Sequence, residues 1–137
     1  MGLLASNVTM LILLALFLTV CNASDANTKV HVNITNALTG SMSMAVHCKT
    51  RFRDLGGQEI PHGSSFEFNF DQGFFTKRLD CNVHWEQAVA HRFIAYDHVR
   101  DEDKCSSGYC MWSIRSDAAC MYNNQRKDFD CSAWPHH

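Results

Sequence analysis

The sequence is poor in proline and glycine, the residues in which extended and low-complexity chains are rich. Its 137 residues include only 2 prolines and 7 glycines, which excludes collagen-like and linker-like chains. Neither sign of charge is in large excess. The chain has 12 lysines and arginines and 14 aspartates and glutamates, which gives a net charge of −2 with neutral histidines. A basic surface for nucleic acid is therefore not expected, and neither is intrinsic disorder. At this length we expect one domain.

The motifs of the common catalytic sites are missing as well. The chain contains no G-x-S-x-G, no H-E-x-x-H, no phosphate-binding loop and no C-x-x-C. His84, His91 and His98 recur every seven residues, a spacing that would align them on a helix but has no such meaning on strands and turns. We therefore predict that the protein is not an enzyme and uses no cofactor or metal.

Charged residues and histidines are absent from the first 23 residues. Within this segment, Met10–Val20 is apolar apart from one threonine, a run too short to cross a membrane, which takes about 20 residues. Its length is typical of the apolar region of a secretion signal peptide, and Cys21 and Ala23 are small residues suited to cleavage after Ala23. An N-terminal lipid anchor is the weaker alternative. We predict a signal peptide over 1–23 and one secreted, extracellular domain over 24–137, with no membrane span.

Cleavage would leave six of the seven cysteines, and an even number in a secreted chain predicts three disulfides. The six are Cys48, Cys81, Cys105, Cys110, Cys120 and Cys131. Since no second pair matches the spacing of Cys105 and Cys110, a metal site has little support. Cys120 is expected to pair with Cys131, near the C-terminus. The other four permit three pairings, of which we favour Cys48–Cys110 and Cys81–Cys105.

Alternation of apolar and polar residues is the strongest structural signal in the predicted mature chain. Residues 30–34 and 66–70 alternate strictly, as a strand with one buried face does. Comparable stripes begin at Met42, Leu79, Arg92 and Cys110. Residues 54–57 are predicted to be a loop, and the tail from residue 120 has no clear period. Six or more short strands separated by turns predict an all-β fold, an antiparallel β-sandwich. Cys48, Cys81 and Cys110 fall on the apolar faces of their strands, so their sulfurs should point into the core.

Two segments are candidates for contact with another protein. The first is the charged stretch 97–104, which we expect to be an exposed loop that contributes little to folding; its candidate contact residues are Asp97, His98, Arg100, Asp101, Glu102, Asp103 and Lys104. The plain alternative is a solvated loop with no partner. The second segment is Lys49–Asp54, where Arg51 and Arg53 flank Phe52 in a composition that suits protein contact.

One surface modification is predicted. Asn33-Ile34-Thr35 is an N-glycosylation sequon, with Asn33 on the polar face of its strand.

Taken together, ordered segments of the chain resemble the plant self-incompatibility S-protein family. The segments that carry the resemblance include His47-Cys48-Lys49-Thr50, Cys81-Asn82-Val83-His84-Trp85, Tyr96-Asp97 with Arg100-Asp101, and Cys110-Met111-Trp112-Ser113-Ile114. The resemblance implies a small secreted protein with an eight-stranded β-sandwich and four usual cysteines at positions 48, 81, 105 and 110. This sequence departs from the family pattern at Ala118, where glycine is usual, and in having Cys120 and Cys131.

The function that the resemblance implies is that of a signalling ligand. Family members in poppy act as ligands of a plasma-membrane receptor in self-incompatibility. We therefore expect a monomeric, secreted, non-enzymatic ligand for a cell-surface receptor protein, in self-incompatibility or in another form of cell–cell communication. A secreted defence protein is the alternative, and a secreted hydrolase is less favoured. The tissue of expression would separate signalling from defence.

Overall fold

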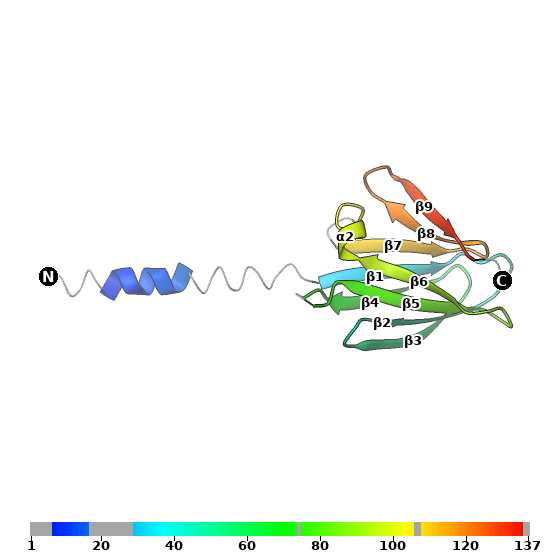
Figure 1. Ribbon diagram of the computed structural model, residues 1–137, viewed down its shortest axis with the longest axis horizontal. Helices are drawn as coiled ribbons and strands as arrows, with labels where there is room; N and C mark the ends of the chain where they lie inside the picture. Colours follow the sequence, from blue (N-terminus) through cyan, green and yellow to red (C-terminus); the bar gives the residue numbers. More distant parts are fainter. Residues whose placement is uncertain (1–6, 17–28, 74, 106–107, 136–137) are drawn as a thin grey trace.

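The protein is a sandwich of two β-sheets (Figure 1). A computed structural model describes residues 7–16, 29–73, 75–105 and 108–135. Residues 7–16 form an exposed helix, and across the described residues no helix is long and apolar enough to cross a membrane. The predicted cleavage site after Ala23 lies outside the described residues, so the predicted signal peptide stays a prediction.

Nine strands make up the two sheets. The five-stranded sheet has the order β4-β1-β7-β8-β9, with β1 Lys29–Asn36, β4 Ser65–Asp71, β7 Tyr109–Ile114, β8 Ala118–Asn123 and β9 Asp128–Ala133. The four-stranded sheet has the order β3-β2-β5-β6, with β2 Met44–Lys49, β3 Asp54–Ile60, β5 Arg78–His84 and β6 His91–Asp97. One short helix, α2 His98–Asp101, follows β6.

The predicted all-β sandwich is confirmed, with three differences in detail. The strands pair antiparallel except β1 and β7, which run parallel. The segment 54–57, predicted to be a loop, belongs to β3, where Leu55 is an extra residue opposite β2 and Gly56 adopts a φ of 88°, as a β-bulge requires. The tail without a clear period forms the β8–β9 hairpin, because its inner face includes polar groups such as Asn123 and Asp130 that hide the alternation.

The core lies between the inner faces of the two sheets, as the alternation predicts. Val32, Ile34 and Ile114 from one sheet and Val46, Leu79 and Val83 from the other are at most 1% exposed. Trp134, after β9, completes the core at the open side of the sandwich. Its ring is 8% exposed and stacks on His91 at a centroid distance of 4.6 Å, and its Nε1 donates to the carbonyl of Arg115 at 3.0 Å.

The three disulfides predicted from the number of cysteines form, but only one joins the pair of cysteines that we expected. Cys48 of β2 and Cys81 of β5 are direct register partners with a Cα–Cα distance of 4.1 Å. Cys120 and Cys131 are partners in the same way across β8 and β9, which confirms that predicted pair. The third disulfide joins Cys105 to Cys110.

The favoured pairing of Cys48 with Cys110 and Cys81 with Cys105 is wrong. Cys48, Cys81 and Cys110 are all on inner faces and at most 1% exposed, as predicted. Cys48 and Cys81, however, lie side by side in the same sheet, whereas Cys110 belongs to the other sheet. Alternation gives the face on which a cysteine lies, but it does not give the neighbouring strand. No disulfide among the described residues joins the two sheets; apolar packing and hydrogen bonds such as that from Trp112 Nε1 to Ala95 O hold them together.

Candidate functional site

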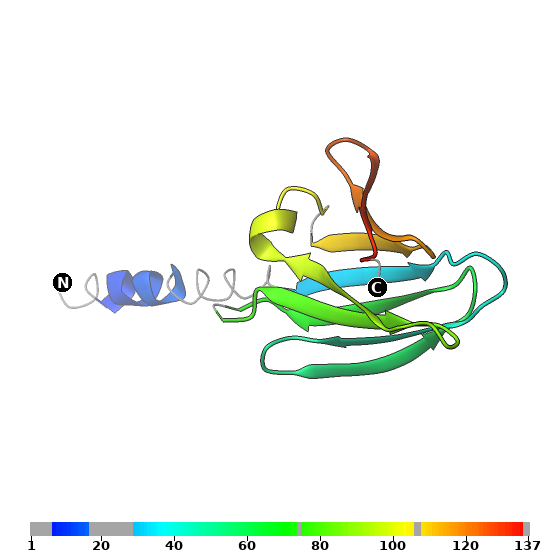
Figure 2. The same cartoon turned by 45° about the vertical axis from the view of Figure 1, so that its right-hand side comes forward.

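Both candidate recognition segments lie at the same end of the sandwich. The register pairs Lys49 with Asp80 and Arg78 with Asp97, so the connections after β2, before β5 and after β6 meet there (Figure 2). We call this region the loop end; it comprises residues 50–53, 72–77 and 98–105, apart from residue 74. Two hydrogen bonds join the second and third of these segments: His98 N donates to Lys77 O at 3.0 Å, and the Gln72 amide contacts His98 Nδ1 at 2.9 Å.

The charged stretch 97–104 is a structured turn, not a free loop. Asp97 caps the N-terminus of α2 by accepting a hydrogen bond from Val99 N at 3.0 Å, as an aspartate in this position does. Asp101 is 0% exposed, and its Oδ2 accepts from Asp97 N at 2.9 Å. The expectation that this whole segment is exposed is therefore wrong at Asp101.

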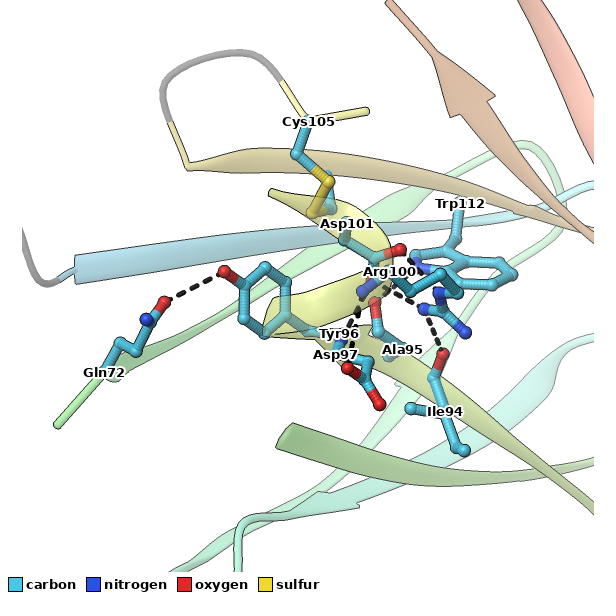
Figure 3. Close-up of a disulfide and its surroundings, with 10 residues drawn as sticks. Gln72, Ile94, Ala95, Tyr96, Asp97, Arg100, Asp101, Cys105 and Trp112 are labelled. Carbon is cyan, nitrogen blue, oxygen red and sulfur yellow. Dashed lines mark hydrogen bonds and ion pairs between the residues drawn. A yellow bond between two sulfur atoms is a disulfide. The ribbon is translucent and has the colours of Figure 1, made fainter. Parts of the chain in front are cut away.

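Arg100 and Asp101 attach the turn to the sandwich (Figure 3). The guanidinium of Arg100 donates to both oxygens of Asp101 and to the carbonyl of Ile94 on β6, the last at 2.8 Å. Its Cζ lies 5.7 Å from the ring centroid of Trp112 on β7, and Trp112 Nε1 donates to Ala95 O at 2.8 Å. Arg100 and Asp101 thus hold α2 against β6 and β7, and Asp101 is not available to a partner.

Other residues of the turn remain accessible. Val99 is 89% exposed, and the side chain of Glu102 is 66% exposed. Asp103 is exposed too, whereas His98 and Lys104 are half-buried; Lys104 Nζ lies 3.8 Å from Asp130. The exposed side chains on α2 and directly after it are therefore Val99, Glu102 and Asp103.

The second candidate segment is a tight turn with its side chains outward. Thr50 is buried and anchors it, since Thr50 N donates to Arg53 O at 2.8 Å and Arg53 N donates to Thr50 Oγ1 at 3.1 Å. Arg51, Phe52 and Arg53 are all exposed, with Arg51 Cζ 5.3 Å from the centroid of the Phe52 ring. The turn presents two cations and an aromatic ring to solvent.

Asp54 closes the same turn on the strand side. Its Oδ1 accepts from Gly56 N at 2.8 Å and contacts His47 Nε2 at 2.6 Å. These hydrogen bonds, that of Gly56 first, lower the pKa of Asp54 below 3.8, because each favours the charged carboxylate.

Tyr96 lies under the loop end and is 5% exposed. Its hydroxyl donates to Gln72 Oε1 at 2.9 Å (Figure 3). Burial raises the pKa of Tyr96 above 10.0, and the nearby charges of Asp101, Glu102 and Asp97 add to the effect.

Sequence reasoning missed three cations beside the turn at Arg51. Lys77, Arg78 and Arg92 lie beside Arg51 around a hollow of about 560 Å³. The available signal was the run Phe74-Phe75-Thr76-Lys77-Arg78, which repeats the aromatic and basic composition of residues 51–53. Their proximity to Arg51 depends on the pairing of β2 with β5, which sequence did not provide.

The predicted glycosylation site lies on the outer face of the five-stranded sheet. Asn33 is half-buried in β1, between Glu67 of β4 and Met111 of β7 in the register. Thr35, the third sequon residue, contacts Ser65 Oγ at 2.6 Å. Among the described residues, no group of three or more His, Cys, Asp or Glu side chains is placed to hold a metal ion.

Comparison with known proteins shows the family. The sequence matches the profile of the family described as "Plant self-incompatibility protein S1" over residues 31–134. S-protein homolog 2 of Arabidopsis thaliana is 34% identical over 118 residues, which cover 82% of this chain and 73% of that protein. S-protein homolog 29 of the same plant is 31% identical over 129 residues, 93% of each chain. Self-incompatibility protein S1 of Papaver rhoeas is 27% identical over 118 residues, 85% of this chain and 84% of that protein. The chain belongs to the plant self-incompatibility protein S1 family.

Proposed function

We propose that this protein is a secreted, non-enzymatic signalling ligand that a receptor on the surface of another cell recognises. The observation that carries the proposal is the family match over residues 31–134, together with the relative in Papaver rhoeas whose name gives its role in self-incompatibility. The apolar N-terminal segment and the three disulfides support passage through the secretory pathway.

The loop end is the surface that best suits recognition. Its turns are anchored by buried groups, Thr50 on one side and Asp101 on the other, so exposed side chains are presented from a rigid base. A surface that is ordered before binding loses less conformational entropy when a partner binds. Val99, Glu102 and Asp103 on α2 and Arg51–Arg53 on the opposite turn are the proposed contact residues.

Secretion is tested by expressing the full chain in plant cells. We expect the protein in the medium with Ser24 as its first residue, established by mass spectrometry of the intact protein. Retention in the cell would contradict secretion, whereas an intact residue 1 in the medium would contradict cleavage after Ala23.

Recognition is tested by binding of the labelled, purified protein to intact cells from several tissues. We expect saturable binding that unlabelled protein displaces. A triple variant, V99D/E102K/D103K, should bind at least about tenfold more weakly. The matched control V89D/E59K/D117K makes the same chemical changes at exposed positions away from the loop end and should bind normally.

The results of the binding assay test the proposed function and the proposed recognition surface separately. Absence of saturable binding to every tissue tested would overturn the proposed function. Normal binding by V99D/E102K/D103K would show that the residues of α2 and those directly after it do not take part in recognition.

A further inference from the structure

Half of the basic residues gather on one part of the molecule. Of 12 lysines and arginines in the chain, six lie on the outer face of the four-stranded sheet or on the turns at its end. They are Lys49, Arg51, Arg53, Lys77, Arg78 and Arg92, and all are exposed. Because the net charge of the chain is −2, this concentration is a strong local departure from the average.

Five of these cations, all except Arg53, line two hollows that meet. The first, of about 560 Å³, lies between the turn at Arg51 and the segment 75–78. The second, of about 360 Å³, lies between β6, the edge strand of its sheet, and the C-terminal residues Ser132–Pro135. Arg78 and Arg92 line both. We call the two hollows together the basic groove.

Asp80 organises the centre of the basic groove. Its Oδ1 accepts from Nε and Nη2 of Arg78 at 3.2 and 3.0 Å and from Nη2 of Arg92 at 3.2 Å. One carboxylate therefore holds two guanidinium groups and leaves the trio with a net positive charge. Of the described residues that line the groove, Asp80 is the only acidic one. A guanidinium has five N–H donors in a planar fork that matches a carboxylate, so both arginines retain donors for a ligand.

Apolar rings line the groove beside the cations. Phe75, 68% exposed, borders the first hollow, and Phe93, Trp112 and Trp134 line the second. Arginine with aromatic residues is the composition enriched where proteins bind proteins. A concave, elongated site fits a chain, whereas a flat or convex surface fits a membrane. The apolar rings of the second hollow also favour a chain with apolar side chains over a uniformly acidic polysaccharide.

We propose that the basic groove binds an extended, carboxylate-rich peptide segment of the protein partner. The inference names the chemistry of the partner and to that extent rests on the proposed function. Aspartate or glutamate side chains would pair with Arg51, Arg78 and Arg92, and a flanking apolar side chain would pack against the rings of the second hollow. Charge-assisted, two-pronged hydrogen bonds of this kind give geometric specificity as well as affinity.

The test measures binding of poly-L-glutamate to the full secreted protein. We expect the triple variant R51Q/R78Q/R92Q to bind at least about tenfold more weakly than the wild type. The matched control R115Q/R126Q/K127Q removes three positive charges from positions outside the groove and should change affinity less than about twofold. Circular dichroism checks folding. If the triple variant does not fold, the single variants Arg51→Gln and Arg92→Gln, at exposed positions, are measured in its place. Each is expected to bind poly-L-glutamate at least about threefold more weakly.

Other results would overturn the proposal. Equal weakening in both triple variants would show attraction to net charge alone. Binding of polygalacturonate or of phosphatidylserine vesicles, without binding of poly-L-glutamate, would assign the groove to a polysaccharide or a membrane.

The cell-binding assay separates this inference from the proposed function. Saturable cell binding that R51Q/R78Q/R92Q leaves unchanged would reject the groove as the partner site and leave the ligand function standing. Absence of cell binding would reject the function, while the poly-L-glutamate measurement would still decide the acidic-peptide specificity of the groove.

Discussion

The guanidinium of Arg100 donates two hydrogen bonds to the carboxylate of Asp101, its neighbour in the chain, with Nε–Oδ1 at 2.5 Å and Nη2–Oδ2 at 2.6 Å. The pair is asymmetric, because the side chain of Asp101 is 0% exposed and that of Arg100 is 35% exposed. This relationship converts a charged stretch of sequence into a fixed turn at the loop end.

Asp101→Ala should therefore destabilise the protein strongly. The substitution removes the acceptor of Asp97 N and the ion-pair partner of Arg100, whose side chain is 35% exposed and therefore partly solvated, at a cost of about 1–3 kcal/mol. Chemical denaturation gives the free energy of unfolding. Glu102→Ala, on a mostly exposed side chain of the same turn, is the control and should change it by less than about 0.5 kcal/mol. A small effect of Asp101→Ala would show that the turn is held by other contacts.

The three disulfides should differ in what they contribute to stability. Their sequence separations are 33, 11 and 5 residues for Cys48–Cys81, Cys120–Cys131 and Cys105–Cys110. On the chain-entropy account, removal by paired alanine substitutions should lower the free energy of unfolding by about 4, 3 and 2 kcal/mol in that order. Non-reducing peptide mapping should find these three pairs, and thiol titration of the secreted, denatured protein should find no free thiol. A cross-link between Cys48 and Cys110 would contradict the sheet pairing.

Tyr96 should make stability fall at alkaline pH. Its pKa in the folded protein is raised above 10.0, so the unfolded chain loses the phenol proton first as pH increases. The contribution is fully present below pH 10.0 and is lost as pH rises through the folded pKa. Ultraviolet absorbance follows ionisation, and denaturation on both sides of pH 10.0 follows stability. In Tyr96→Phe the late-ionising phenol should disappear, and the decline with pH should become shallower; an unchanged titration curve would assign that phenol to another tyrosine.

Asn33 should carry one N-glycan on the outer face of the five-stranded sheet. Enzymatic deglycosylation of the secreted protein should lower its mass by one glycan, and Asn33→Gln should abolish the change. Because Met111, 54% exposed, is the register partner of Asn33, the glycan should also slow oxidation of Met111 by hydrogen peroxide. Equal oxidation rates with and without the glycan would show that it extends away from β7.

Local alternation determined much of this fold. A period of two needs only neighbouring residues, so the sequence alone identified the strands with strict alternation and placed Cys48, Cys81 and Cys110 on inner faces. It failed where a strand departs from the period. The bulge at Gly56 made the start of β3 look like a loop, and polar inner residues such as Asp130 concealed the β8–β9 hairpin.

The tertiary structure decided which strands are neighbours, and the candidate site depends on that. Sequence could count the disulfides but could not pair Cys48 with Cys81, because pairing requires the long-range register of β2 and β5. It marked Asp97–Lys104 as charged without showing that Asp101 is buried. It gave no reason to associate Arg51 with Arg78 and Arg92, which lie 27 and 41 positions away in the chain. They meet because β5 is hydrogen-bonded between β2 and β6, and the two arginines share the carboxylate of Asp80. Residue type and local period are properties of the sequence, whereas the meeting of distant charges follows only from the order of strands in the sheet.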